Sequence, residues 1–140
     1  MADLTRKLGI RAGDVICLLG APPEAESAIR ENAPPGVQFS TELFGKRYQA
    51  VFFWPTELPG LVARFAELQG RIHPDGAVWA VLPKKPYAAR RGIAFTWEQM
   101  QAAGLSTDLV DNKVASVTEQ DYATRFVIRK ERRMSYYKST

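Results

Sequence analysis

Residues 75–85 read DGAVWAVLPKK, and this stretch decides the fold. The turn dipeptide Asp75-Gly76 is followed by six consecutive apolar residues, Ala77 to Leu82, and Pro83 ends the run. Six residues are too few for a stand-alone helix and suit a strand that is buried on both faces. Such a strand needs helices above and below it, so the stretch predicts an α/β sheet.

Two lysines, Lys84 and Lys85, come directly after this strand. In open α/β sheets, ligands bind outside the carboxyl ends of the strands. We therefore expect both lysines to lie where a binding site would be.

Two other apolar runs predict buried strands of the same kind. Val15–Leu19 is ended by Gly20, and Ala50–Trp54 is ended by Pro55. A shorter strand is expected over Val37–Leu43. The link from there to the next strand is too short for a parallel neighbour unless the Val37–Leu43 strand is very brief or antiparallel.

Helices are expected between the strands. The first runs from Pro22-Pro23 to about Asn32, and a second, capped by Thr56, carries apolar residues at three-and-four spacing as far as Ile72. A third begins at the capping box Thr96-Trp97-Glu98-Gln99 and stops at Gly104.

The last third of the chain predicts a hairpin of two strands, residues 109–117 and 122–129, the second with one side in water as at a sheet edge. Residues 1–130 then form one domain, a three-layer Rossmann-like sheet that is mostly parallel and ends in an antiparallel hairpin. Residues 131–140 lack an apolar period and are expected to be a basic tail.

The composition is that of a globular domain, with 46% hydrophobic and 24% charged residues among 140. The single cysteine, Cys17, excludes an internal disulfide and suits a reducing compartment. No apolar run has the length of a signal peptide or of a membrane span. We expect a cytoplasmic protein without a membrane partner; its oligomeric state is left open.

The net charge of +4 is concentrated in two stretches, Lys84–Arg91 and Arg129–Lys138. Together they hold nine of the 19 basic residues and a single acidic one, Glu131. They contribute +8, which leaves −4 for the rest of the chain. The basicity therefore forms two local patches and does not indicate a surface that coats polyanions generally.

The order of elements resembles the class I methyltransferase fold with one helix and one strand removed from its middle. Three segments, 13–21, 75–85 and 104–130, are also similar to the domain of unknown function 3052 family, which consists of small uncharacterised bacterial proteins. The most specific parts are the Trp-x-x-x-Pro-Lys motif at Trp79 and the Leu-Val-Asp-x-Lys-Val strand at Leu109. Tyr122-Ala123 stands where the family has Trp-Ser. The resemblance implies the fold and no established activity.

The turn after the first strand, Gly20-Ala21-Pro22-Pro23, occupies the place of a methyltransferase's glycine-rich cofactor loop. It keeps one glycine, and its two prolines remove backbone donors, which disfavours a phosphate. Glu42 follows Gly20 at a distance where an acidic residue could meet a ribose hydroxyl. We expect no cofactor, with S-adenosylmethionine as the alternative.

Trp54 and Pro55 stand where methyltransferases often carry a polar-Pro-Pro-aromatic motif. The polar residue is absent, so amino-group methylation loses its usual means of orienting the nucleophile. Trp54 is then a rim aromatic that packs on the sheet, or a residue of a ligand site.

Lys84, Lys85, Arg90 and Arg91 could gather four positive charges at the carboxyl edge of the sheet. Such a cluster suits an anionic small molecule or a nucleic-acid backbone. The alternative is a solvated loop. The second basic stretch mixes arginines with Tyr136-Tyr137, which is typical of single-strand binders and equally of a solubilising tail.

Nucleophilic and metal chemistry have little support. His73 is the only histidine and Cys17 lies in the middle of a strand, so neither a Cys-His pair nor a His/Cys ligand set is expected. We therefore predict a binding or regulatory module without catalytic residues. The alternatives are a minimal S-adenosylmethionine-dependent methyltransferase and a small nucleic-acid-binding protein.

Overall fold

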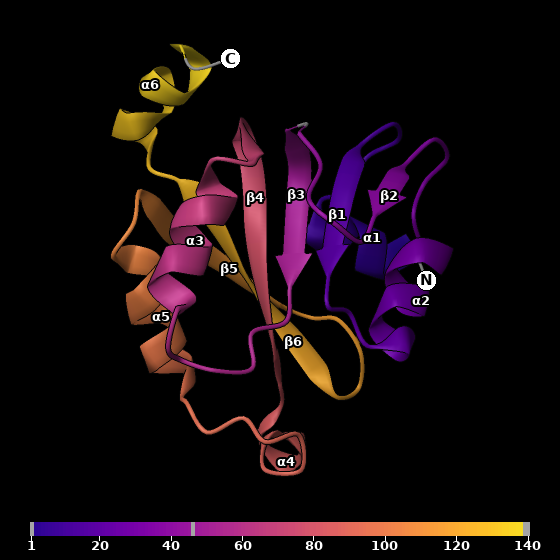
Figure 1. Cartoon of the computed structure of the whole chain (residues 1–140). Helices are drawn as coiled ribbons and strands as arrows, with labels where there is room; N and C mark the ends of the chain where they lie inside the picture. Colours follow the sequence, from indigo (N-terminus) through magenta and orange to yellow (C-terminus); the bar gives the residue numbers. More distant parts are fainter. Residues whose placement is uncertain (1, 46, 139–140) are drawn as a thin grey trace.

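The computed structural model describes residues 2–45 and 47–138, and these form one mixed sheet (Figure 1). The strands are β1 (Val15–Leu19), β2 (Gln38–Ser40), β3 (Tyr48–Phe53), β4 (Ile72–Pro83), β5 (Leu109–Ser116) and β6 (Asp121–Ile128). Their order across the sheet is β2-β1-β3-β4-β6-β5. The first four are parallel, whereas β6 is antiparallel to both β4 and β5. The predicted fold, a mostly parallel sheet finished by an antiparallel hairpin, is confirmed.

Helices cover both faces of the sheet and so complete the three layers. They are α1 (Ala2–Leu8), α2 (Pro23–Glu31), α3 (Leu61–Gln69), α4 (Lys85–Ala88), α5 (Trp97–Leu105), the 3-10 turn η1 (Lys130–Arg132) and α6 (Arg133–Lys138). Figure 1 shows α3 and α5 in front of the sheet. Apolar side chains of α1 and α2 pack against its back.

The buried strands separate two apolar cores because successive side chains alternate between the two faces of the sheet. In β4, Val78 and Ala80 join the front core with Phe65 of α3. Trp79 joins the back core, where its ring stacks on Phe52 with 5.6 Å between centroids.

The strand β4 is longer than the apolar run that predicted it. Asp75-Gly76, expected to be a turn, lies inside β4, where the pairing with β3 is irregular. A Cβ at Gly76 would lie 2.8 Å from the carbonyl oxygen of Gln49 and 3.0 Å from that of Tyr48. The glycine is therefore required for close backbone approach rather than for a turn.

The predicted hairpin of β5 and β6 is present, but β6 is not at the edge of the sheet. It lies between β4 and β5, and residues of both of its sides are buried, such as Phe126 on one and Ala123 and Val127 on the other. Successive side chains of β6 do face opposite ways, as the sequence predicts. Both sets include small and apolar residues, so both faces of β6 can be covered. The edge strand at this end of the sheet is β5, and β2 is the edge strand at the other end.

The short link between β2 and β3 is possible because β2 has only three residues, one of the two solutions expected. It crosses the front of β1, where Leu43 packs on the front core and the carbonyl oxygen of Glu42 accepts a hydrogen bond from Cys17 Sγ at 3.5 Å. Burial raises the pKa of the Cys17 thiol above its ordinary value. The link thus covers a face that would otherwise need a helix.

Helix α3 begins later than the sequence predicts. Its N-cap is Gly60, with a φ of 83°, and not Thr56. A residue before a proline is disfavoured in the helical region, so Leu58-Pro59 prevents an earlier start. The segment from Pro55 to Gly60 is left as a loop at the carboxyl end of β3.

The expected tail after residue 130 is folded as far as Lys138; residues 139–140 lie outside the described part. The hydroxyl of Tyr136 in α6 donates to Asp108 Oδ2 at 2.7 Å, and Arg133 Nε donates to the carbonyl oxygen of Ile128 at 2.9 Å. These polar contacts hold the segment against the sheet. The prediction of a tail used only the absence of an apolar period, so it could not detect them. Within the described residues, no helix is long and apolar enough to cross a membrane.

Candidate functional site: the cleft at the carboxyl edge

A cleft of about 460 Å³ opens where β1 and β3 end, and we call it the carboxyl-edge cleft. Its walls are Leu19, Gly20, Phe53–Glu57, Pro59–Leu61 and Arg64. The chain leaves β1 toward α2 and leaves β3 toward α3, which pack on opposite faces of the sheet. Strands β1 and β3 therefore flank the topological switch point, where ligands bind in folds of this type.

Gly20 forms the turn that lines one side of this cleft. Its φ of 76° lies in the left-handed region, which glycine adopts without strain. Apart from its chain neighbours, no described residue has an atom within 4 Å of the place where a Cβ would be. The turn therefore leaves open space against the backbone, as close approach of a ligand requires.

Trp54 lines the cleft at the end of β3, next to Gly20. Its ring is partly buried against the back core, and its indole Nε1 is buried without a hydrogen-bond partner among the described residues. A buried N–H without a partner costs about 1–3 kcal/mol, and a ligand acceptor would remove that cost. This unpaired donor distinguishes Trp54 from a purely structural rim aromatic.

The start of α2 is unsuited to phosphate. Pro22 and Pro23 supply no N–H groups there, and Glu24 adds negative charge in the first turn. An anion is disfavoured by both features. The cleft is better suited to a ligand that approaches without a phosphate.

Glu42 lies just past the end of β2, in the link that crosses the front of β1. Its carbonyl oxygen accepts from Cys17 Sγ at 3.5 Å, so its backbone is beside the middle of β1. Its side chain is exposed and does not line the cleft. The structure thus does not bring Glu42 together with Gly20 and Trp54.

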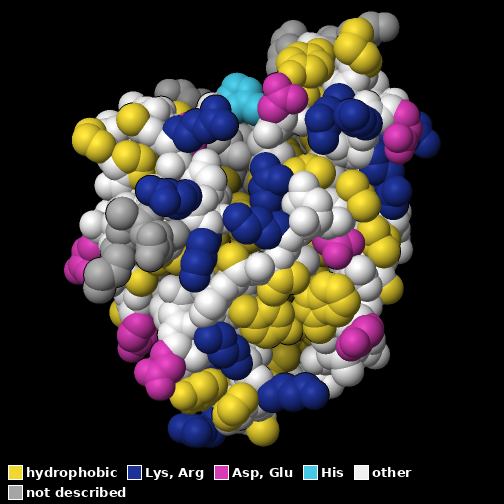
Figure 2. Space-filling model, turned by 180° about the vertical axis from the view of Figure 1, so that it is seen from behind, with side chains coloured by type: hydrophobic (Ala, Val, Ile, Leu, Met, Phe, Trp, Pro, Cys, Tyr) yellow, Lys and Arg dark blue, Asp and Glu magenta, His cyan; other side chains and the backbone are white. Residues whose placement is uncertain are grey.

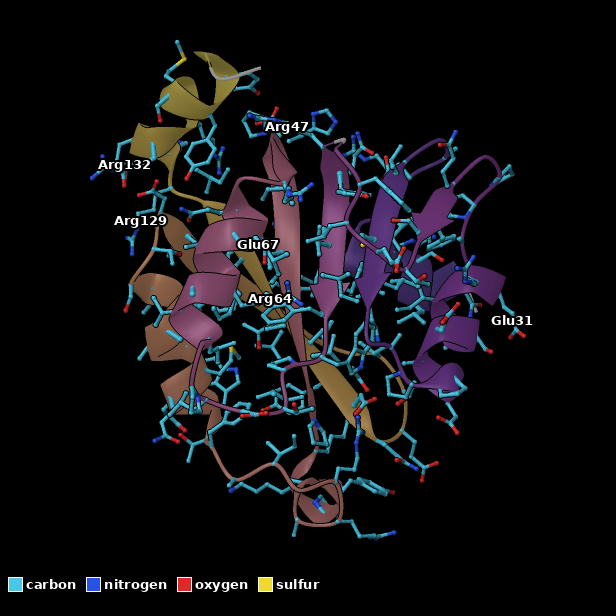
Figure 3. All side chains as sticks on the ribbon, in the orientation of Figure 1. Glu31, Arg47, Arg64, Glu67, Arg129 and Arg132 are labelled. Atoms are coloured by element: carbon cyan, nitrogen blue, oxygen red, sulfur yellow. The ribbon has the colours of Figure 1, made fainter. Side chains whose placement is uncertain are left out.

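Arg64 of α3 is the basic side chain that lines this cleft. Its Nη1 donates to Glu67 Oε1 at 2.8 Å, and both side chains are about half exposed. Figure 3 shows both on the side of α3 that faces β3. An exposed pair of this kind contributes little to stability, so Arg64 can exchange Glu67 for a ligand at low cost.

Two of the four basic residues predicted to form an anion site are bound within the protein. Lys84 Nζ donates to Ser116 Oγ at 2.8 Å and to the carbonyl oxygen of Thr118 at 3.1 Å. Arg91 forms an ion pair with Asp121, whose side chain is only 4% exposed. Both therefore fasten the turn between β5 and β6 to the carboxyl edge.

Lys85 and Arg90 are the other two, and both are exposed on or beside α4. The Arg90 guanidinium lies over the Tyr87 ring, 5.3 Å from its centroid. Within the described residues neither side chain forms an ion pair. A hollow nearby is lined by Arg91 but also by Glu24, Glu119 and Asp121, so acidic groups outnumber basic ones in it.

The two basic stretches lie at opposite ends of the molecule. Helix α4 is at the carboxyl end of β4, and α6 is beside its amino end (Figure 1). Figure 3 shows Arg129 and Arg132 directed away from the sheet near α6. The structure does not bring the two stretches together into one surface for nucleic acid.

Sequence reasoning missed several parts of the cleft, chiefly Thr56, Glu57 and Arg64. They follow β3 directly or open α3, so the rule that pointed to Lys84 also applies to them. Asp121, the partner of Arg91, gave no sequence signal because the register of the hairpin brings it there.

No protein-family model and no curated protein matches the chain. Solved structures do match. A TehB-like S-adenosylmethionine-dependent methyltransferase from Corynebacterium glutamicum has a TM-score of 0.59 and 8% identity, over 91% of this chain and 86% of that one. Magnesium protoporphyrin IX methyltransferase from Synechocystis, with bound S-adenosylhomocysteine, has a TM-score of 0.60 and 10% identity, over 91% and 80%. An N-methyltransferase from Bradyrhizobium japonicum has a TM-score of 0.57 and 10% identity, over 91% and 93%.

The chain has the class I methyltransferase fold. At identities of 8 to 10%, the similarity shows the fold alone. The resemblance to the domain of unknown function 3052 family remains a prediction.

Proposed function

We propose that this chain is a binding module of the methyltransferase fold that holds an adenosyl ligand, S-adenosylmethionine or S-adenosylhomocysteine, in the carboxyl-edge cleft. The observation that carries the proposal is the place of Trp54 in the wall of a cleft at the topological switch point, with a buried Nε1–H that has no partner among the described residues. The open glycine turn at Gly20 supports it, because it leaves space against the backbone.

S-adenosylmethionine is compatible with the features at the start of α2 that disfavour a phosphate. S-adenosylmethionine carries a sulfonium, an adenosine and an amino acid group but no phosphate. The missing donors at Pro22 and Pro23 are therefore no obstacle, and the charge of Glu24 is compatible with a cation. Gly20 and Trp54 would form the walls for the adenosyl group, and Arg64 would face its carboxylate.

Methyl transfer is not part of the proposal. The position after β3 is Trp54, which has no acceptor oxygen to orient a nucleophile. Of the two ligands, S-adenosylmethionine would supply an activated methyl group to a positioned nucleophile. Among the described residues, the titratable side chains that line this cleft are Glu57 and Arg64. An anionic ligand or partner at Lys85 and Arg90 stays a further prediction.

The test is calorimetric titration and thermal unfolding of the whole chain with S-adenosylmethionine, S-adenosylhomocysteine, adenosine and AMP. A ligand that binds the native state raises the melting temperature by mass action. We expect both adenosyl compounds to do so and AMP to bind more weakly than adenosine. No stabilisation by any adenosyl compound would refute the proposal.

Two tryptophan variants localise the effect. Trp54→Phe removes the unpaired N–H and should weaken S-adenosylhomocysteine binding by about tenfold. Trp97→Phe is the matched control, because Trp97 Nε1 already donates to Thr124 Oγ1 at 2.8 Å, away from the cleft. Transfer of a labelled methyl group to any small-molecule or protein acceptor would show that the chain is an enzyme and would refute the proposal of a binding module.

A further inference from the structure

A second cleft, of about 500 Å³, lies at the opposite edge of the sheet, and we call it the amino-edge cleft. It is formed by α1, the loop before β1, the start of β4, Arg125 of β6 and Tyr137 of α6. It opens on the back of the molecule. Figure 2 shows Lys and Arg side chains gathered over the middle and upper part of this back face, among hydrophobic ones.

Trp79 is part of the wall of this cleft and carries an unpaired donor. The residue is fully buried and stacked on Phe52, yet its Nε1 has no hydrogen-bond partner among the described residues. Trp97, by contrast, has its indole N–H paired with Thr124. A buried N–H of this kind indicates an acceptor that the protein itself does not supply.

Arg125 lies directly opposite Trp79 in the antiparallel pair of β4 and β6, so both side chains are on the same face. The guanidinium is partly buried, and its Nη1 donates a hydrogen bond to Asn112 Oδ1 at 3.3 Å. Burial lowers its pKa, and Arg133 lowers it further. Within the described residues it forms no ion pair with a carboxylate, so a positive charge in this wall remains uncompensated.

The other charges around the cleft disfavour a doubly charged anion. Arg11 is a second cation, but Asp14 and Asp75 add two carboxylates. Asp14 Oδ2 accepts from the backbone N–H of Arg11 at 2.9 Å, and Asp75 Oδ2 accepts from the Tyr137 hydroxyl at 2.5 Å. A doubly charged phosphate would be repelled by these carboxylates more than a monoanion would be.

The apolar part of the lining is chiefly Leu8, Ile10 and Ala77, and Gln49 and His73 add two further polar side chains. An apolar wall beside a few directed polar groups is the usual composition of a small-molecule site. We propose that the amino-edge cleft binds a small carboxylate with an apolar body, its oxygens accepting from Trp79 Nε1–H and the Arg125 guanidinium. The site is separate from the carboxyl-edge cleft and does not depend on the function proposed there.

The test is calorimetric titration of the whole chain with benzoate, benzamide and phenyl phosphate. Benzamide keeps the ring and loses the charge, whereas phenyl phosphate carries an additional charge. We expect benzoate to bind at least tenfold more tightly than either, because a hydrogen bond to a charged group is worth about 1.5–3 kcal/mol. Equal affinity for phenyl phosphate, or no binding of benzoate at millimolar concentration, would overturn the assignment.

Variants decide which side chains hold the carboxylate. Arg125→Gln and Trp79→Phe should each weaken benzoate binding by about tenfold, whereas Trp97→Phe should leave it unchanged. Because Trp79→Phe alters the core, the native chain provides the independent measurement. Its Trp79 indole N–H signal should shift in a nitrogen-15 spectrum as benzoate is added, and an unmoved signal would refute the contact.

Discussion

The two clefts lie at opposite edges of one sheet, and each is lined by a tryptophan whose N–H has no partner among the described residues, but they are built differently. The carboxyl-edge cleft is formed by loops that leave parallel strands, around the open turn at Gly20. The amino-edge cleft also has walls from α1, α6 and the loop before β1, but its proposed ligand groups, Trp79 and Arg125, are side chains of neighbouring strands near the tight backbone contact at Gly76. The first kind of site follows from strand order, whereas the second depends on strand register.

The largest expected effect is a difference in stability between alanine substitutions at Gly76, beside the amino-edge cleft, and at Gly20, beside the carboxyl-edge cleft. A methyl group at Gly76 would meet carbonyl oxygens of the backbone at 2.8–3.1 Å, so Gly76→Ala should cost roughly 3 kcal/mol. At Gly20 the space is open and only the positive φ opposes a side chain, so Gly20→Ala should cost about 1 kcal/mol. Urea unfolding of both variants measures the difference. If both substitutions lowered the free energy of unfolding equally, the contrast between close backbone packing at Gly76 and open space at Gly20 would be wrong.

The next effect tests what the basic residues of the carboxyl edge do. Arg91→Ala leaves the buried carboxylate of Asp121 without its ion pair and should lower the free energy of unfolding by about 2 kcal/mol. Arg90→Ala, the control in the same loop, should change it by less than about 0.5 kcal/mol. If both variants were equally stable, Arg91 would be free for a ligand, as the sequence suggested.

The smallest effect concerns the hydrogen bond between Tyr136 and Asp108, which holds α6 at the amino edge of the sheet. Burial, followed by the hydrogen bond to Asp108, raises the pKa of Tyr136 above its ordinary value. A tyrosine with a raised pKa contributes stability that is complete below its unfolded pKa of about 10 and is lost as the pH rises above it. Tyr136→Phe should therefore cost about 1 kcal/mol at pH 8 and flatten the loss of stability above pH 10.

Thermal unfolding of the native and Tyr136→Phe chains from pH 8 to pH 11 checks this. If the melting temperature fell equally steeply above pH 10 in both chains, ionisation of Tyr136 would not be the cause of the loss of stability. The ion pair of Arg91 at the carboxyl edge should be insensitive in this range, because arginine remains charged there.

The parts of the fold that the sequence predicts are those decided by local pattern. Unbroken apolar runs indicate the buried strands, and the box at Thr96 starts its helix as expected. The hairpin of β5 and β6 also follows from alternation. Glycine, proline and binary pattern act over a few residues, so they can be recognised without the tertiary structure.

The parts that the sequence did not predict depend on contacts between distant residues. Helix α6 is held by Tyr136 against Asp108, and Arg91 is held by Asp121. The partners are 28 and 30 residues apart, and no local pattern pairs them. The amino-edge cleft was missed for the same reason, since only the register of β4 and β6 places Arg125 beside Trp79.

The most direct measurement is a titration of the native chain with S-adenosylhomocysteine, observed through the indole N–H signals of its three tryptophans. Single Trp→Phe variants assign the signals. The account predicts that the Trp54 signal shifts as its unpaired N–H gains an acceptor, while those of Trp79 and Trp97 stay in place. A Trp54 signal that does not move at saturating ligand, or a shift at Trp79 instead, would contradict it.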